Sequence, residues 1–119
     1  MSDKTERVES MKITDSEKNV TYELDFNRDA VRFAEARQFR VEDVSNYPNS
    51  KIPELFYYAF RMHHKNLART QTDAIFDMLG GLTGDMLERL VLLYEQAALS
   101  NTIQTDEDMG KNARMAVEL

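Results

Sequence analysis

The chain has 119 residues, which is enough for one modest hydrophobic core and too few for two large domains. Hydrophobic residues make up 42% of it and charged residues 30%, which argues against both wholesale disorder and a membrane class, and the absence of cysteine excludes disulfides, a thiolate nucleophile and cysteine-based metal sites. The net charge of −6 argues against binding nucleic acid through the whole surface, because affinity for phosphates rests on Lys and Arg.

The N-terminal stretch MSDKTERVES is charged where a secretory signal would need an apolar core. No later run approaches the roughly 20 apolar residues of a transmembrane helix. Together with the lack of cysteine, these features predict a cytoplasmic protein that does not bind membranes. We expect residues 1–9 to be flexible and residues 1–99 to form a single domain.

A β-hairpin is predicted at residues 11–24. Short β-prone runs at Met11–Thr14 and Val20–Leu24 flank the polar turn DSEKN, and apolar and polar residues alternate in the second run. A two-stranded hairpin alone is marginally stable in water, so we expect its apolar face to pack on the helices that follow.

The hydrophobic period then changes from two to about 3.6 residues in DFNRDAVRFAEARQF, which predicts a helix. Asn27 is suited to be its N-cap, and Phe26 and Val31 stand at the positions of a hydrophobic staple. We expect the helix to end near Gln38–Phe39. The stretch Val41–Val44 is compatible with one helical turn before the loop sequence NYPNS.

The central helix is expected at about Lys51–Asn66. Ser50 can cap it, and Pro53 falls in its first turn, where a missing amide proton costs little. Two more helices are expected at about Thr70–Leu79 and Thr83–Leu99, separated by a pair of glycines that favours a helix stop.

These elements predict a mainly α protein of the α+β class, with a small N-terminal β-hairpin packed on a compact bundle of about four helices and a flexible acidic tail at residues 100–119. Charge is unevenly placed. Residues 28–69 carry eight basic and five acidic side chains, whereas residues 70–119 carry three and nine. This polarity is either a docking aid for a protein partner or a local bias of a solvated surface.

The two histidines, His63 and His64, are adjacent in the aromatic segment FYYAFRMHHKN. At 3.6 residues per turn, a helix that continues to residue 66 places His63 in the middle of the apolar stripe and His64 at its edge. A chelating helical pair is spaced three or four residues apart, so adjacent histidines do not indicate a metal site. We therefore expect a mostly buried His63 with a hydrogen-bond partner, a His64 at the edge, and no metal or cofactor.

No catalytic signature is visible in the chain. It has no GxSxG elbow, no Walker loop and no Rossmann glycine run, and GGLTG lacks the lysine that a phosphate-binding loop uses. We expect no catalytic residues and predict that the protein is not an enzyme. A small enzyme that depends on His63 and His64 remains an alternative, because the members of a catalytic triad can lie far apart in sequence.

The last predicted helix combines a broad apolar face with a thin second ridge on its opposite side, formed by Leu92 and Leu99. Such a pair is either two scattered surface leucines or part of an interface. Tyr57 and Tyr58 form an aromatic edge that offers a second candidate contact. The candidate partner surface therefore consists of Tyr57, Tyr58, His64, Leu92 and Leu99. The predicted core face consists of Met86, Leu87, Leu90, Val91, Leu93, Tyr94, Ala97 and Ala98.

Three stretches carry a family resemblance: VTYELDFNRDAVRFAEARQF, IPELFYYAFRMHHKNLARTQTDAIFDMLGGL and LERLVLLYEQA. In this order they resemble the small tail assembly chaperones of long-tailed bacteriophages and prophages. The likeness spans about residues 20–99, and its motifs are core patterns, not catalytic signatures. It implies a non-enzymatic assembly factor that binds the tape-measure protein and helps recruit tail-tube subunits in the cytoplasm of the bacterial host.

Chaperones of this kind are often also made as a longer frameshift product, and the acidic C-terminal end is compatible with that arrangement. The family supplies no catalytic residues, because its role depends on surfaces. Self-association is a further expectation. A small protein-binding adaptor or regulator is the main alternative, since it would use the same kind of surface with a different partner.

Overall fold

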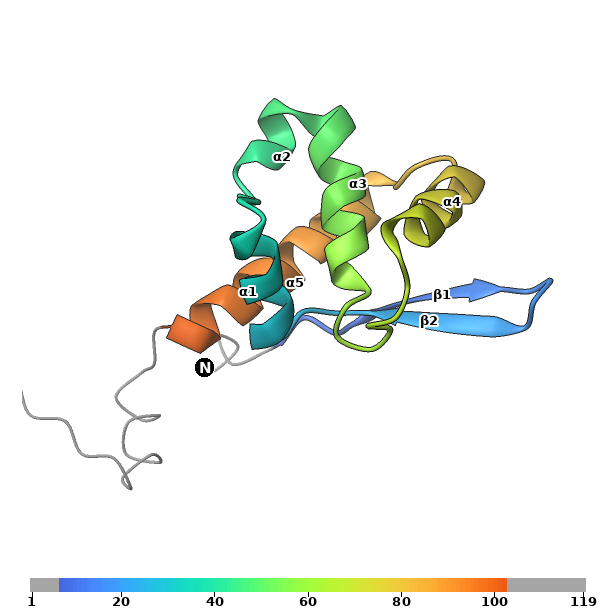
Figure 1. Ribbon diagram of the computed structural model, residues 1–119, viewed down its shortest axis with the longest axis horizontal. Coiled ribbons are helices and arrows are strands. Elements are labelled where there is room, and N and C mark those ends of the chain that lie inside the picture. Colours follow the sequence, from blue (N-terminus) through green and yellow to red (C-terminus); the bar gives the residue numbers. More distant parts are fainter. Residues whose placement is uncertain (1–6, 103–119) are drawn as a thin grey trace, which may run out of the picture.

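A two-stranded hairpin leads into five helices in the computed structural model, which describes residues 7–102 (Figure 1). This confirms the predicted mainly helical α+β fold, with one helix more than expected, because the turn after residue 41 forms a short helix of its own. The elements are β1 (Met11–Asp15), β2 (Val20–Leu24), α1 (Arg28–Ala36), α2 (Asp43–Asn46), α3 (Pro48–Ala59), α4 (Arg69–Leu79) and α5 (Gly84–Thr102).

The two ends of the chain differ from the predicted boundaries. Val8, in the stretch expected to be flexible, donates its N–H to Gln96 Oε1 at 2.8 Å, and Arg89 Nη1 donates to the carbonyl oxygen of Glu9 at 3.0 Å. The last helix continues to Thr102, three residues into the expected tail. Residues 1–6 and 103–119, the rest of both predicted segments, lie outside the described residues.

The hairpin is anchored at its base. Its strands pair in antiparallel register with Met11 opposite Leu24, and burial increases along β2 from Val20, which is 38% exposed, to Leu24, which is fully buried. The far end of the hairpin projects away from α1 and α3 (Figure 1). In the turn, Asn19 adopts a φ of 56°, a left-handed conformation that Asn tolerates better than most residues. The predicted packing of the hairpin on the helices therefore holds for its base.

The start of α1 follows the predicted capping pattern. Asn27 accepts a hydrogen bond from the N–H of Ala30 at 2.9 Å, which satisfies one of the amide groups that a helix N-terminus leaves free. Phe26 and Val31, the predicted staple, are each 4% exposed and belong to the core. The helix stops at Ala36, because Gln38 turns left-handed with a φ of 64° and sends Phe39 back into the core.

The core is built on a chain of aromatic contacts. Phe39 meets Tyr58 and Tyr94 edge-to-face, with ring centroids 5.2 and 5.6 Å apart, and Tyr94 meets Phe26 in the same geometry at 5.1 Å. Such edge-to-face pairs stabilise by about 0.5 to 1.5 kcal/mol beyond their buried area. These contacts join α1, α3 and α5 into one body.

The boundaries predicted for the central helix were wrong. It begins three residues earlier, with Pro48 in its first turn, and ends at Ala59, not Asn66. In a continuing α-helix the carbonyl of Ala59 would accept from residue 63, but here it accepts the N–H of Asp25 at 3.0 Å. The end of β2 thus takes the acceptor that the next helical turn would have needed. Residues 60–64 form turns instead.

The predicted core face of α5 is confirmed for four of its eight residues, and the other four, Met86, Leu87, Val91 and Ala98, are half-buried. Leu90, Leu93, Tyr94 and Ala97 are buried, while Leu92 is 40% exposed and Leu99 is 59% exposed. Within residues 7–102, no helix combines the length and the apolar character needed to cross a bilayer.

Two leucines of α5 give a matched test of this packing. Leu90→Ala should lower the free energy of unfolding by about 2 to 5 kcal/mol, because Leu90 is fully buried and its truncation leaves a cavity. Leu92→Ala, the same change two residues away, should cost less than about 1 kcal/mol, because Leu92 is exposed. Urea denaturation of the two variants measures both; similar losses would contradict the assigned helix face.

Candidate functional site

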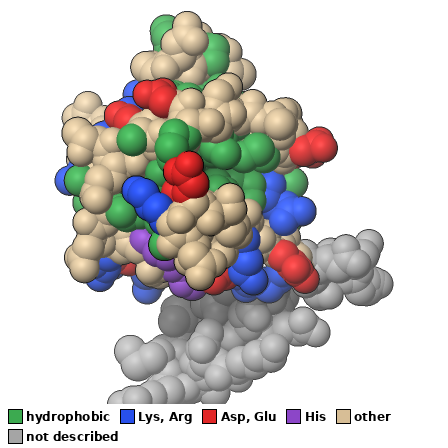
Figure 2. All heavy atoms as spheres, turned by 90° about the vertical axis from the view of Figure 1, so that its right-hand side faces the viewer, with side chains coloured by type: hydrophobic (Ala, Val, Ile, Leu, Met, Phe, Trp, Pro, Cys, Tyr) green, Lys and Arg blue, Asp and Glu red, His purple; other side chains and the backbone are tan. Residues whose placement is uncertain are grey.

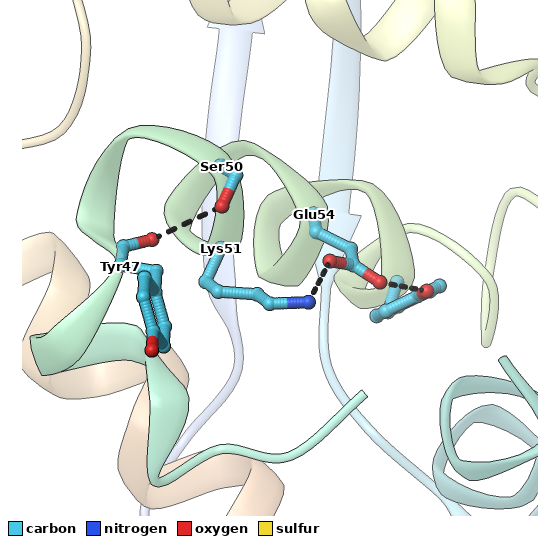
Figure 3. Close-up of polar contacts among 5 residues, drawn as sticks. Tyr47, Ser50, Lys51 and Glu54 are labelled. Atoms are coloured by element: carbon cyan, nitrogen blue, oxygen red, sulfur yellow. Dashed lines mark hydrogen bonds and ion pairs between the residues drawn. The ribbon is translucent and has the colours of Figure 1, made fainter. Parts of the chain in front are cut away.

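Tyr58, which the sequence placed on a candidate partner surface, is buried in the core. Its side chain is 2% exposed and packs edge-to-face on Phe33 and Phe39. Its hydroxyl donates a hydrogen bond to Glu54 Oε2 at 2.5 Å, so burial leaves no polar group unpaired. Lys51 Nζ approaches the other oxygen of Glu54 at 3.2 Å (Figure 3). Burial and the bond to Glu54 raise the pKa of Tyr58 above that of an ordinary tyrosine.

Tyr57 and His64, two further candidates, lie on one small crevice. They line it together with Phe33 and Leu67, and its volume of about 10 Å³ holds no more than a water molecule. The ring of Tyr57 lies 5.8 Å from the guanidinium of Arg69. Both side chains are half-buried in contacts within the chain, so this crevice offers little to a partner.

His63 was predicted to be mostly buried and His64 to lie at the edge of the apolar stripe, but in the structure His64 is the more buried of the two. His63 is exposed, and its Nε2 lies 3.7 Å from Glu23 Oε2. His64 is half-buried: its Nε2 accepts the N–H of Glu23 at 2.9 Å, and its ring meets Tyr22 edge-to-face with the centroids 5.5 Å apart. The helical wheel used for the prediction does not apply, because α3 ends four residues before His63.

The hydrogen bond that His64 accepts from Glu23 links the segment after α3 to strand β2. A histidine nitrogen that accepts a hydrogen bond carries no proton, so this contact needs the neutral ring. Burial lowers the pKa of His64, and the nearby His63 lowers it further, while Glu23 acts in the opposite direction. The hydrogen bond from Ser10 holds the pKa of Glu23 low. These contacts have a structural role, and we call the contacts of His64 with Glu23 and Tyr22 the His64 clasp. Among residues 7–102, no three His, Cys, Asp or Glu side chains are grouped so that they could hold a metal ion.

Leu92 lies on an open groove between α2 and the start of α3 on one side and α5 on the other. The groove has a volume of about 450 Å³, and its only charged lining residues are Glu42 and Glu88. The apolar residues that line it are Val41, Val44, Pro48, Ile52, Leu87, Val91 and Leu92. Most of this lining was predicted as core or loop, and only Leu92 was named as a candidate contact.

A second hollow continues the groove along α5. It shares Val41 and Glu42 with the first, has a volume of about 560 Å³, and reaches Tyr94 and Ala98. We call the two hollows together the α5 groove. Burial, followed by the charges of Glu35 and Glu42, raises the pKa of Tyr94 to about 12. Leu99 lines neither hollow, so the two leucines of the predicted ridge have different surroundings.

A separate groove lies between the hairpin and α4. Ile13, Tyr22 and Ile75 line it together with Met78 and Leu79, which are 69% and 41% exposed. Figure 2, a view onto the end of the molecule where α4 and the hairpin tip lie, shows hydrophobic side chains gathered in the middle of this face, with charged side chains around and between them. Sequence reasoning missed this surface, although the adjacent Met78 and Leu79 at the end of a predicted helix were the available signal.

A family model described as a domain of unknown function (DUF5055) matches residues 1–119. No curated protein and no solved structure is similar enough to the chain to count as a match.

The His64 clasp predicts a pH-dependent stability. Because the pKa of His64 is lowered in the folded protein, the unfolded chain takes up the proton first as the pH falls below about 6.5. Stability is therefore complete above that pH, and the urea midpoint should fall between about pH 7 and pH 5. His64→Gln keeps an acceptor that does not titrate and should flatten this loss, whereas the matched change His63→Gln should preserve most of it, because burial is the larger cause of the lowered pKa of His64. An unchanged pH profile in His64→Gln would contradict the assignment.

Proposed function

The chain belongs to the DUF5055 family, and we propose that it is a non-enzymatic binding protein whose α5 groove holds an apolar segment of a partner protein. The observation that carries the proposal is the groove around Leu92, an open surface lined almost entirely by apolar side chains. Exposed apolar patches with a polar rim are typical of protein-protein contacts.

The shape of the groove favours reversible binding. It is open along its length, and its lining comes from four helices, α1, α2, α3 and α5, and from the segment that joins α1 to α2. A shallow groove of this kind buries part of a ligand's apolar surface without enclosing it, so release does not require the protein to open. This behaviour suits a chaperone, which must hold an aggregation-prone segment and then give it up.

The partner follows from the resemblance to phage tail assembly chaperones. We infer that the protein binds the tape-measure protein and helps to recruit tail-tube subunits around it during tail morphogenesis, in the cytoplasm of the bacterial host. The motif order of residues 20–99 supports this function, and the α5 groove offers a surface on which the binding can take place. The same groove would serve a small adaptor with another partner, which the choice of co-expressed protein distinguishes.

Leu92→Glu should abolish or strongly reduce co-purification of the tape-measure protein encoded in the same gene cluster, because it places a charge among the apolar side chains of the groove. The fold should survive, because Leu92 is 40% exposed. Co-expression and affinity purification measure the complex, and circular dichroism verifies the fold.

Leu99→Glu is the matched control: the same substitution on the same helix, at a residue that is 59% exposed and outside the groove. It should leave co-purification unchanged. Equal binding of the tape-measure protein by wild type and Leu92→Glu would contradict the groove as its binding site. A tape-measure protein that never co-purifies with the wild type would contradict the proposed chaperone function.

A further inference from the structure

The α5 groove is long enough for several turns of a helix. Its lining residues on α5 run from Gly84 to Ala98, which at 1.5 Å per residue corresponds to roughly 21 Å, or about four turns. The two hollows share Val41 and Glu42 and both lie along α5, so they are neighbours on one side of this helix.

The charges that line the groove are mostly of one sign. Among the described residues that line it, Glu35, Glu42 and Glu88 are acidic and only Arg40 is basic. The raised pKa of Tyr94, to which Glu35 and Glu42 both contribute, agrees with a negative potential at this wall. An acidic ligand would be repelled here, and lysine or arginine beside an apolar face would be attracted.

The backbone N–H and C=O groups of the ligand must also have hydrogen-bond partners when the ligand is bound. The groove is lined by helices and by the segment between α1 and α2, and the strands of the hairpin contribute nothing to it. An extended peptide would find no strand edge to pair with, whereas a helix satisfies its own N–H and C=O groups and can lay an apolar face into a groove.

We propose that the α5 groove takes an amphipathic helix of about four turns from a partner protein, with lysine or arginine flanking its apolar face. This inference rests on the proposed binding function and adds to it the secondary structure and the charge of the ligand. A second copy of the chain is a poorer occupant. The solvent side of α5 carries three acidic residues, Asp85, Glu88 and Glu95, against one basic residue, Arg89, so a second copy that used this helix would bring an excess of like charges together.

The test uses the full chain and two synthetic helical peptides of about 15 residues. Both carry the same leucine and alanine face with one central tryptophan; one has lysine on its flanks and the other has glutamate. The protein contains no tryptophan, so the emission of the peptide reports binding without background. The lysine peptide should bind roughly tenfold more tightly than the glutamate peptide at physiological salt.

A pair of double variants locates the site. Glu42→Lys with Glu88→Lys reverses the charge at the rim of the groove and should weaken binding of the lysine peptide by about tenfold. Glu17→Lys with Asp77→Lys makes the same change in net charge on the hairpin turn and α4, outside the α5 groove, and should leave the affinity within about twofold. All four positions are exposed, so each variant should fold, which thermal denaturation verifies.

Several outcomes would overturn the inference. Equal affinity for the two peptides, no binding of either, or equal loss in the two double variants each contradicts a basic helix in this groove. Dimerisation of the unliganded protein that Glu42→Lys with Glu88→Lys disrupts would assign the groove to a second copy. If the tape-measure protein co-purifies in a Leu92-dependent manner while neither peptide binds, the proposed function is supported and the basic amphipathic helix as ligand is contradicted. If the peptides bind as expected but the tape-measure protein does not co-purify, the basic amphipathic helix as ligand is supported and the proposed function is contradicted.

Discussion

The C-terminal half of α3 is buried almost completely, and the other elements are arranged around it. Leu55, Phe56, Tyr58 and Ala59, and Phe60 directly after the helix, are each at most 2% exposed. A helix that is apolar nearly all round can be stable in water only if neighbours cover every side of it. Four helices, α1, α2, α4 and α5, lie around α3 (Figure 1). The ring of Tyr22, on the hairpin, packs edge-to-face on that of Phe60. The buried hydroxyl of Tyr58 is tolerated because Glu54 accepts its proton.

The same constraint decides where α3 ends and what the histidines do. The N–H of Asp25 takes the carbonyl of Ala59, so the chain turns away before His63. His64 then lies against β2 and accepts the N–H of Glu23, which would otherwise face the outside of a two-stranded sheet without a partner. The adjacent histidines, the most conspicuous candidate for chemistry in the sequence, thus hold the hairpin to the helical body.

The α5 groove is what this arrangement leaves uncovered. One face of α5 packs on α1 and α3, while the chain between α1 and α3 covers the flank of α5 only in part. Val41, Val44 and Val91 therefore contribute both to the edge of the core and to the wall of an open surface. A binding surface made of partly buried core residues needs no separate motif, which explains why its sequence looks like that of an ordinary core.

Local rules determined much of the fold. The Asn27 cap, the glycine that ends α4 and the buried residues of α5 each depend on residues within a few positions of one another, and the structure agrees with these three. The alternation in β2 predicted the strand correctly, but burial rises along the strand from Val20 to Leu24 and does not alternate. The sequence also placed Leu92 and Leu99 on the exposed side of α5, because helical periodicity fixes the faces of a long helix. The tertiary structure alone decided the end of α3, the burial of Tyr58 and the reversal of the two histidines. Each depends on a contact between segments far apart in the chain, above all the bond from Asp25 to Ala59, and no periodicity within one segment contains that information.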